Sequence, residues 1–299
     1  MNLYKKFIPK KARFAVLKML RFIPDAPMIK FQYSMKLKRK LDLKNPQRYT
    51  EKIQWYKLYY RNADMPVCVD KYRVREYIQR KGLEDHLVQL YATYERPEEV
   101  RLSDLPDKFI LKTTNGSGTN IICKDKSKLN QEELIGKIKG FFKQSSASAG
   151  REWPYSYVVP KIIVEQLLED PESPDGALKD YKFLCFNGKP EYVVLDVDRF
   201  TQHKRNIYDV NWKDLHIESD CPCADEEYAR PDTLDEMLNI AKVLCKDFPA
   251  VRVDLYSVQG KIYFGELTFF PWSGYVQYTP DDFDFEMGRR FVLPKTNMK

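Results

Sequence analysis

The fold is decided by residues 251–268, which read VRVDLYSVQGKIYFGELT. Apolar and polar residues alternate on both sides of Gly260, a pattern typical of two antiparallel strands joined by a tight turn. Arg252 and Asp254 point to one side of the first strand, whereas the valines beside them point to the other. The stretch therefore predicts a hairpin with one apolar face and one charged face.

The register of this hairpin decides what its charges do. A two-residue loop sets Asp254 opposite Gly265, whereas a three-residue loop sets it opposite Glu266 and sets Arg252 opposite Thr268. Facing carboxylates repel each other. They are tolerated when a cation lies between them, and Mg²⁺ with phosphate oxygens suits that arrangement. The other interpretation is a sheet with one solvated face, on which alternating charges carry no function.

The rest of the chain predicts an α+β protein with antiparallel sheets and two closely packed lobes. A second hairpin is expected at 181–197, because Asn187-Gly188 is a strong turn signal. Thr50 is expected to cap one helix at its start, and Gly82 to end another. The expected helices are 50–60, 70–81, 131–143 and 233–246, and the other expected strands are 109–111, 121–123 and 162–168.

A hydroxyl-rich loop at 115–120 follows the strand that ends near Lys112. Its glycines let backbone N–H groups turn toward a phosphate, and Lys112 supplies a positive charge. The loop is neither a Walker A motif nor a Rossmann fingerprint, and on its own a plain β-turn explains it as well. Two further features are equally weak alone: Lys182 lies in a strand, and the strand 162–168 breaks where its backbone can meet an adenine edge.

In this order, the motifs resemble the ATP-grasp superfamily, and D-alanine–D-alanine ligases show the same succession. The chain is more closely similar to the TupA-type ATP-grasp proteins of bacterial polysaccharide clusters, over roughly residues 40–290. The stretches that carry the resemblance are NPQRYTEKIQWYK at 45–57, DKYRVREYI at 70–78, ILKTTNGSG at 110–118, KDYKFLCFNGKPEYV at 179–193 and VRVDLYSVQGKIYFGELTFFPWSGY at 251–275.

The resemblance implies a set of site residues. It implies that Arg252 and Lys182 are catalytic and that Asp254, Glu266 and Thr268 hold Mg²⁺, although Thr268 stands where the superfamily usually has Asn. The residues it implies for ATP are Lys71, Lys112 and Lys182 at the phosphates, Asn115, Gly116, Ser117, Gly118 and Thr119 in a lid, Glu165, Gln166 and Leu168 at the adenine, and Glu169 at the ribose.

The resemblance also implies the reaction. A carboxylate–amine ligase would use ATP and Mg²⁺ to form an acyl-phosphate, and would join an amino acid or another amine to a uronic-acid carboxyl of a bacterial cell-surface polysaccharide. The acceptor side is expected at Asp198, Arg199, Lys204 and Arg205, where a solvated basic loop is the other interpretation. Trp272 is expected either to stack on a sugar ring or to pack in the core.

Two other functions are compatible with the sequence. A sugar kinase would need a base near its acceptor, for which Asp198 or Asp180 is available. A non-enzymatic binder of acidic polymer would act through a basic N-terminal arm. Residues 1–48 hold fourteen Lys or Arg and two acidic residues, which is a charge of +12 in a chain of net charge +7. That amphipathic arm predicts either contact with anionic lipid or polymer or a helix packed on the body with a solvated basic face, and no nucleic-acid-reading motif accompanies it.

Composition sets the remaining expectations for the 299 residues. We expect the chain to divide into the arm at 1–48, a mostly helical region at 49–100, a small lobe at 101–170 and a large lobe with the metal site at 171–299. Six sparse cysteines indicate reduced thiols and a cytoplasmic protein. The basic arm is what would bring the protein into peripheral contact with the inner membrane face. Cys221-Pro-Cys223 has poor zinc spacing and is expected to be a plain loop.

Overall fold

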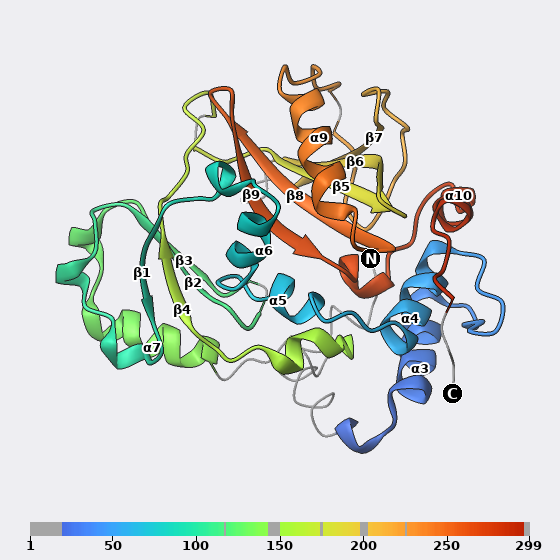
Figure 1. Cartoon of the computed structure of the whole chain (residues 1–299), viewed down its shortest axis with the longest axis horizontal. Helices are drawn as coiled ribbons and strands as arrows, with labels where there is room; N and C mark the ends of the chain where they lie inside the picture. The colour runs from blue at the N-terminus through green and yellow to red at the C-terminus, as the bar shows by residue number, and fades with distance from the viewer. Residues whose placement is uncertain are drawn as a thin grey trace.

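Two antiparallel sheets form the centre of the molecule in a computed structural model (Figure 1). The structure describes residues 20–116, 118–142, 150–173, 176–197, 203–224 and 226–295. The expected α+β architecture with antiparallel sheets is confirmed. Within the described ranges, no helix combines the length and apolar character needed to cross a bilayer.

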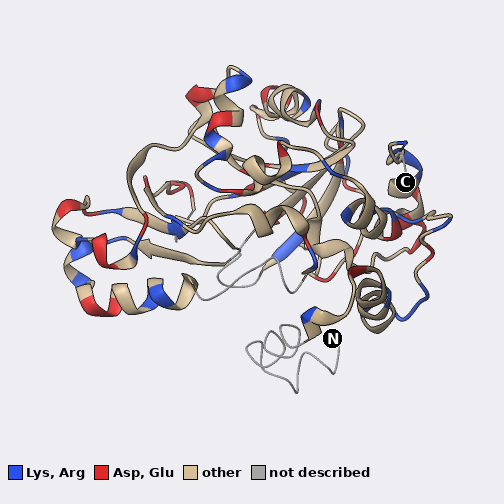
Figure 2. Ribbon diagram, turned by 60° about the horizontal axis from the view of Figure 1, so that its bottom comes forward, with Lys and Arg blue, Asp and Glu red and all other residues tan. Residues whose placement is uncertain are grey.

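The smaller sheet has four strands in the order β1-β4-β2-β3. Helix α7, Gln131–Phe142, packs against β2 through Leu134 and Ile138, which join Phe109 and Leu111 in one apolar core. Acidic residues lie in the first turn of α7 and Lys139 in its last turn (Figure 2), which matches the helix dipole. The strands are β1 Leu90–Tyr94, β2 Phe109–Thr113, β3 Asn120–Cys123 and β4 Ile162–Glu165.

The larger sheet has five strands in the order β7-β6-β5-β8-β9. Helix α9, Leu234–Cys245, lies along β5, β6 and β8 and covers the apolar face of the sheet (Figure 1). Both predicted hairpins are present, turning at Asn187-Gly188 and at Gln259-Gly260. The strands are β5 Asp180–Phe186, β6 Lys189–Val197, β7 Lys204–Asp209, β8 Ala250–Val258 and β9 Lys261–Thr268.

A one-residue bulge sets the register of the β8–β9 hairpin. Val258 pairs with Lys261 across a two-residue turn. Asp254 nevertheless pairs with Glu266, because the register shifts between Asp254 and Leu255. The extra residue is Gly265, where an added Cβ would lie 3.0 Å from the backbone O of Asp254. The carboxylates therefore face each other as in the three-residue-loop alternative, but a bulge and not a longer loop is the cause.

Among the described residues, five helices lie near the start and end of the chain. They are α3 Asp25–Leu37, α4 Tyr49–Tyr59, α5 Met65–Val69, α6 Val74–Arg80 and α10 Asp282–Arg290. Helix α5 contacts β9 of the large sheet, and α3 and α10 pack on α4. Turns of 3₁₀ helix span Leu20–Phe22, Glu84–His86, Pro97–Glu99, Leu102–Asp104, Lys126–Lys128, Trp153–Tyr157 and Pro271–Gly274. The amphipathic N-terminal arm is described only from residue 20, and its first nineteen residues lie outside the described part.

Several expected boundaries are wrong. Helix α4 begins one residue early with Arg48 as its N-cap, because Thr50 instead donates its hydroxyl to Asp284 at 2.7 Å. The helix expected over 70–81 begins at Val74, since the Asp70 carboxylate accepts backbone N–H groups and holds a turn before it. The strand expected over 162–168 ends at Glu165. Gly82 follows α6 in the left-handed region, as expected, and all six cysteines are free.

Candidate active site

The charged face of the large sheet carries most of the candidate site. Residues directly opposite in antiparallel strands share a face, and Lys182 lies opposite Asp254, which lies opposite Glu266. The same face continues to Asp180 and Asp196, which lie opposite each other on β5 and β6. The other face holds the apolar residues that pack on α9. Strands β6, β5 and β8 thus gather buried charges on one surface, to which β9 adds the more exposed Glu266.

Arg252 is the centre of this group. Its Nε and Nη2 donate to both oxygens of Asp254 at 2.6 and 2.7 Å, and Nη2 also donates to Glu266 at 2.8 Å. The Thr268 hydroxyl donates to Glu266 at 3.2 Å. Burial raises the pKa of Asp254 to about 7, although Arg252 and Lys182 oppose the shift. The guanidinium therefore joins the two carboxylates predicted to hold a metal.

Lys182 lies between three aspartates. Its Nζ contacts Asp180 in an ion pair and lies 3.2 Å from Asp196 and 3.9 Å from Asp254. Asp196 also accepts Arg205 Nε at 2.7 Å. Although burial opposes it, the charges of Lys182 and Arg205 lower the pKa of Asp196. Asp196 is thus a fixed anion that orients the two cations beside it.

The small sheet supplies the facing cations. Ile110 pairs with Glu165 and Lys112 with Ile163, so Lys112 and Glu165 project from the same face. Lys112 Nζ lies 2.8 Å from Glu165, and Arg75 contacts the same carboxylate at 3.4 Å. Lys71 donates to the backbone O of Gly116 in the glycine loop, and burial lowers the pKa of Lys71.

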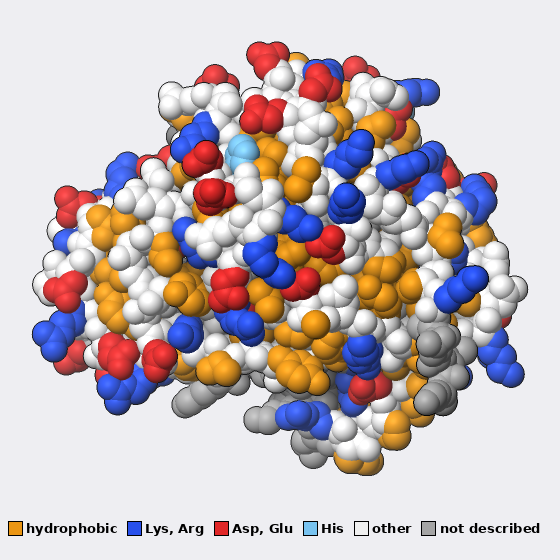
Figure 3. Space-filling view, in the orientation of Figure 1, with side chains coloured by type: hydrophobic (Ala, Val, Ile, Leu, Met, Phe, Trp, Pro, Cys, Tyr) orange, Lys and Arg blue, Asp and Glu red, His pale blue; other side chains and the backbone are white. Residues whose placement is uncertain are grey.

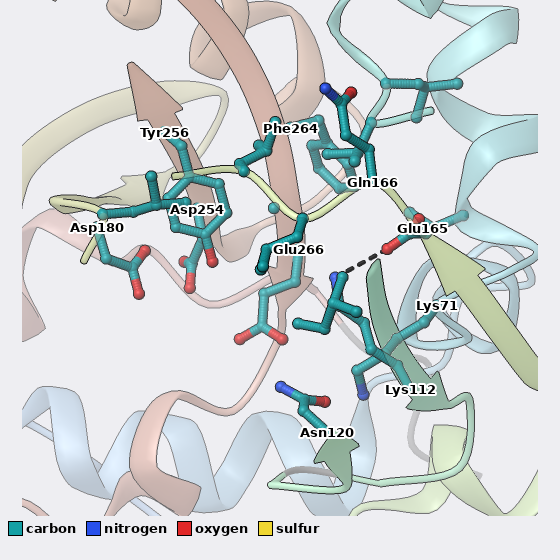
Figure 4. Close-up of a pocket in the computed structure, with 18 of the residues that line it drawn as sticks. Lys71, Lys112, Asn120, Glu165, Gln166, Asp180, Asp254, Tyr256, Phe264 and Glu266 are labelled. Carbon is teal, nitrogen blue, oxygen red and sulfur yellow. Dashed lines mark hydrogen bonds and ion pairs between the residues drawn. The ribbon is translucent and has the colours of Figure 1, made fainter. Parts of the chain in front are cut away.

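A first cavity of about 310 Å³ lies between the two sheets. Figure 4 shows the carboxylates of Asp180, Asp254 and Glu266 gathered on one side and Lys71, Lys112 and Glu165 on the other. Apolar side chains line the rest, namely Val74, Leu87, Val88, Ile110, Leu167, Leu168, Leu178 and Phe264. An apolar volume ending in cations and carboxylates suits a base at one end and phosphates at the other.

A second cavity of about 400 Å³ adjoins the first. The two share a wall that includes Lys71, Lys182, Arg252 and Glu266. On the face of the molecule that Figure 3 shows, charged side chains gather at the centre, over the junction of the sheets. Beyond the wall, the second cavity is lined by Glu152, Tyr155, Asp196, His203, Arg205, Thr268, Trp272 and Ser273, among others.

The second cavity is lined in part by the turn Pro271–Gly274. Trp272 and Ser273 both adopt positive φ, at 49° and 57°, which L-residues rarely do. Two buried side chains of α4 hold them there: Gln54 donates to the backbone O of Ser273 at 2.9 Å, and Lys57 donates to the same oxygen at 3.1 Å. This clamp places the Trp272 ring 4.6 Å from the Arg205 guanidinium.

Asp254 and Glu266 fit a magnesium site. Mg²⁺ is usually held by one or two carboxylates together with waters and substrate phosphates. Among the described residues, no group of three or more His, Cys, Asp and Glu side chains is arranged around a common metal position. Two carboxylates are within the number that magnesium sites use.

The sequence matches the family described as TupA-like ATPgrasp over residues 51–292. The chain belongs to the TupA-like ATP-grasp family. The match spans both sheets, the cavity between them and the helix that clamps the second cavity. No curated protein matches the sequence.

Solved structures similar to this TupA-like protein include three ligases. The D-alanine–D-alanine ligase of Bacillus anthracis complexed with ATP shares 14% identity over 68% of this chain and 54% of its own, with a TM-score of 0.40. The Helicobacter pylori D-alanine–D-alanine ligase shares 16% over 77% and 60%, with a TM-score of 0.42. The L-amino acid ligase of Bacillus licheniformis shares 16% over 69% and 44%, with a TM-score of 0.41. The chain thus spans about half the length of these proteins.

The structure brings most of the predicted site residues together. Those lining one or both cavities are Lys71, Lys112, Gly116, Gly118, Glu165, Gln166, Leu168, Lys182, Arg205, Arg252, Asp254, Glu266 and Thr268. Asn115, Thr119, Lys204 and Glu169 line neither cavity. Glu169, expected at the ribose, instead pairs with Lys108 at 2.7 Å on the surface. Ser117, Asp198 and Arg199 lie outside the described residues.

Sequence reasoning missed other residues of the two cavities. Arg75, Asp196, Glu152, Tyr155 and His203 all line them. Asp196 was within reach, because it lies in the predicted hairpin with Lys182. A bulge in that hairpin shifts its register between Leu184 and Cys185, so counting from the turn gives the wrong partner. Glu152 lies in a loop, and loop residues carry no periodic signal.

Proposed function

We propose that this protein is an ATP- and Mg²⁺-dependent carboxylate–amine ligase. The observation that carries the proposal is the wall shared by the two cavities, which includes Lys71, Lys182, Arg252 and Glu266. Membership of the ATP-grasp family supports ATP in the first cavity. A phosphoryl group at the wall would then lie beside any substrate in the second cavity.

The first cavity suits ATP from end to end. Its apolar side chains would enclose the adenine, and Gln166 would border it. The backbone N–H of Gln166 would not donate to the adenine, because it is already bonded to the backbone O of Gln89 at 2.9 Å. Lys71 and Lys112 would bind the phosphates from the small-lobe side, and Lys182 from the large sheet. Asp254 and Glu266 would hold Mg²⁺, which neutralises phosphate charge when bound.

Arg252 would act at the wall. A substrate carboxylate oxygen attacks the γ-phosphorus, the bond from that phosphorus to the ADP oxygen breaks, and an acyl-phosphate forms. An amine then attacks the acyl carbon, phosphate leaves, and the amine loses a proton. Both steps build negative charge that a preorganised guanidinium stabilises. Because Arg252 is held by both Asp254 and Glu266, it is already oriented before substrate arrives.

The second cavity supports an acidic saccharide and an amino acid as the joined substrates. Arg205 and Trp272 both line this cavity, with the guanidinium 4.6 Å from the ring, and a cation beside an aromatic ring suits a sugar that carries a carboxylate. We propose a uronic-acid carboxyl of a bacterial surface polysaccharide, and the family supports that choice only by analogy. For a sugar kinase, Asp180 is a poor base, because it is held by Lys182 and lines only the first cavity, and the other candidate base, Asp198, lies outside the described residues.

Calorimetry of ATP with Mg²⁺ tests the nucleotide site. We expect binding that requires Mg²⁺ in the wild type and is lost in Asp254→Asn/Glu266→Gln. Asp232→Asn/Glu227→Gln, which neutralises two exposed carboxylates outside both cavities, is the matched control and should bind as the wild type does. A folded wild type that binds no ATP would remove the ligase and the kinase together.

Hydroxylamine distinguishes the two reactions. With ATP, Mg²⁺ and D-glucuronic or D-galacturonic acid, a ligase forms an acyl-phosphate that hydroxylamine traps as a hydroxamate. Replacing hydroxylamine by each of the common amino acids should then give an amide, ADP and phosphate. A sugar phosphate ester in place of the hydroxamate would establish the kinase instead.

A further inference from the structure

The second cavity contains a carboxylate for which no ion pair is found among the described residues. Three carboxylates line this cavity: Glu152, Asp196 and Glu266. Asp196 pairs with Lys182 and Arg205, and Glu266 pairs with Arg252. In the described part of the chain, Glu152 forms no ion pair. Its one hydrogen bond comes from the hydroxyl of Ser273, which donates to Oε1.

Burial makes this carboxylate costly to keep charged. Burial raises the pKa of Glu152, and the nearby charge of Lys57 only partly offsets the shift. The Lys57 ammonium is already used, since it donates to Gln54 at 3.1 Å and to the backbone O of Ser273 at 3.1 Å. A desolvated carboxylate is stabilised when a cation with N–H donors reaches it. The site is thus electrostatically incomplete.

The position of Glu152 is fixed by its surroundings. Ser273, its hydrogen-bond donor, is held in the left-handed region by Gln54 and Lys57 of α4. Gly150 lies so close that an added Cβ would be 2.6 Å from both Glu152 Oε1 and Ser273 Oγ. The chain therefore leaves room for this contact and holds the carboxylate at the cavity surface.

Tyr155 lies in the cavity with this carboxylate and with the proposed reaction centre. It lines the same cavity, and burial raises its pKa, with further contributions from the charges of Glu152 and Glu266. A group bound at Glu152 is therefore in the cavity that also contains Arg252 and the proposed phosphoryl position. The cations Lys71, Lys182 and Arg252 thus lie at the shared wall, whereas Glu152 lies elsewhere on the cavity surface.

We propose that Glu152 binds the ammonium group of the amine substrate within the second cavity. This inference rests on the proposed ligase function and assigns its second substrate a place. The chemical class is a primary or secondary amine, which is a cation before it reacts. A hydroxyl compound of the same shape would hydrogen-bond to Glu152 but would not neutralise it, so the site discriminates amines from alcohols.

Matched amine and alcohol pairs test the proposal by direct binding. The probes are L-alanine with L-lactate, glycine with glycolate, and D-glucosamine with D-glucose, each measured by saturation-transfer NMR and calorimetry. Full-length wild type, Glu152→Gln and Glu152→Asp are compared with and without Mg²⁺ and the ATP analogue AMP-PNP. Glu172→Gln, an exposed carboxylate outside both cavities, is the matched control.

We expect at least one amine to bind about tenfold or more tightly than its alcohol, as loss of a charge-assisted contact predicts. Glu152→Gln should remove that preference, Glu152→Asp should retain part of it, and Glu172→Gln should leave it unchanged. AMP-PNP affinity should be the same in all four proteins, which shows that each is folded.

The outcomes separate this inference from the proposed function. If the wild type shows no preference for amines, or if Glu152→Gln keeps the preference, the assignment of Glu152 is wrong while ATP binding stands. If AMP-PNP does not bind but the preference for amines depends on Glu152, the amine site stands and the ligase proposal is wrong.

Discussion

Arg252 and Asp254, two residues apart on β8, form an ion pair with two hydrogen bonds of 2.6 and 2.7 Å. Asp254 is also a proposed Mg²⁺ ligand. The buried carboxylate would therefore be shared between the guanidinium and the metal, with the Lys182 ammonium 3.9 Å away. In the free protein the guanidinium holds the carboxylate in place, and metal binding has to share or replace that contact.

The first prediction concerns pH. Because burial raises the pKa of Asp254 to about 7, a proton competes with the metal below that pH. The Mg²⁺-dependent part of ATP affinity should therefore rise as pH increases from 6 to 8. Calorimetry in buffers of different ionisation enthalpy should detect proton release on binding near pH 7.

His203 provides the control for this experiment, since its imidazole lines the second cavity. His203→Gln should keep the pH dependence, whereas Asp254→Asn should lose both the affinity and its pH dependence. A pH profile that disappears in His203→Gln would show that Asp254 is not its source.

The second prediction concerns Lys112. Its ammonium lies 2.8 Å from Glu165 at the small-lobe side of the first cavity. Lys112→Met should weaken ATP binding about 10- to 100-fold, because a charge-assisted contact to phosphate is lost. Lys139→Met, an exposed lysine of α7 outside both cavities, should bind ATP as the wild type does. Equal affinities for AMP and for ATP in the wild type would argue against phosphate contact.

The feature of the fold that the sequence patterns did not predict is the register of the β8–β9 hairpin. The turn residues predict both hairpins, and alternation predicts which face of each strand is apolar. Neither pattern reveals the bulge at Gly265 that brings Asp254 opposite Glu266. A bulge depends on cross-strand packing and on the absence of a side chain at one position, which periodicity does not encode.

The family resemblance supplied the nucleotide residues that periodicity could not. It assigned Lys112 and Lys182 to one site although seventy residues separate them, and both line the first cavity. Glu169, which it assigned to the ribose, lines neither cavity and pairs with Lys108 and Lys124. Glu152 and Asp196 remained hidden because their roles depend on which partners the fold brings near them.

A third prediction tests packing between α10 and the chain before α4. An added Cβ at Gly288 would lie 2.0 Å from the backbone O of Gln47, which leaves no room for any side chain. Gly288→Ala should lower the free energy of unfolding by about 1–3 kcal/mol or more. Thermal or urea denaturation measures the change.

The matched substitution is Gly140→Ala in helix α7, where an added Cβ meets nothing within 4 Å. It should raise the free energy of unfolding by about 0.5–1 kcal/mol, because alanine is the better helix former. Equal effects at the two glycines would show that Gly288 does not pack closely on Gln47.

A fourth prediction concerns Lys57. Burial lowers the pKa of Lys57 to about 8, whereas a lysine in the unfolded chain titrates near 10.4. Between these values the unfolded state binds more protons, so this lysine makes stability rise with pH. The free energy of unfolding of the wild type relative to Lys57→Met should therefore increase from pH 8 to pH 10. Parallel stability curves for the two proteins would contradict this.

The grip of Gln54 and Lys57 on Ser273 has a consequence for engineering. Helix α4 precedes both sheets in the chain, yet it shapes a turn that follows the last strand. A minimal catalytic core trimmed to the sheets would keep the nucleotide residues and release Trp272 and Ser273 from their unusual backbone conformation. Anyone who transplants the second cavity to another ATP-grasp scaffold would have to carry this helix with it.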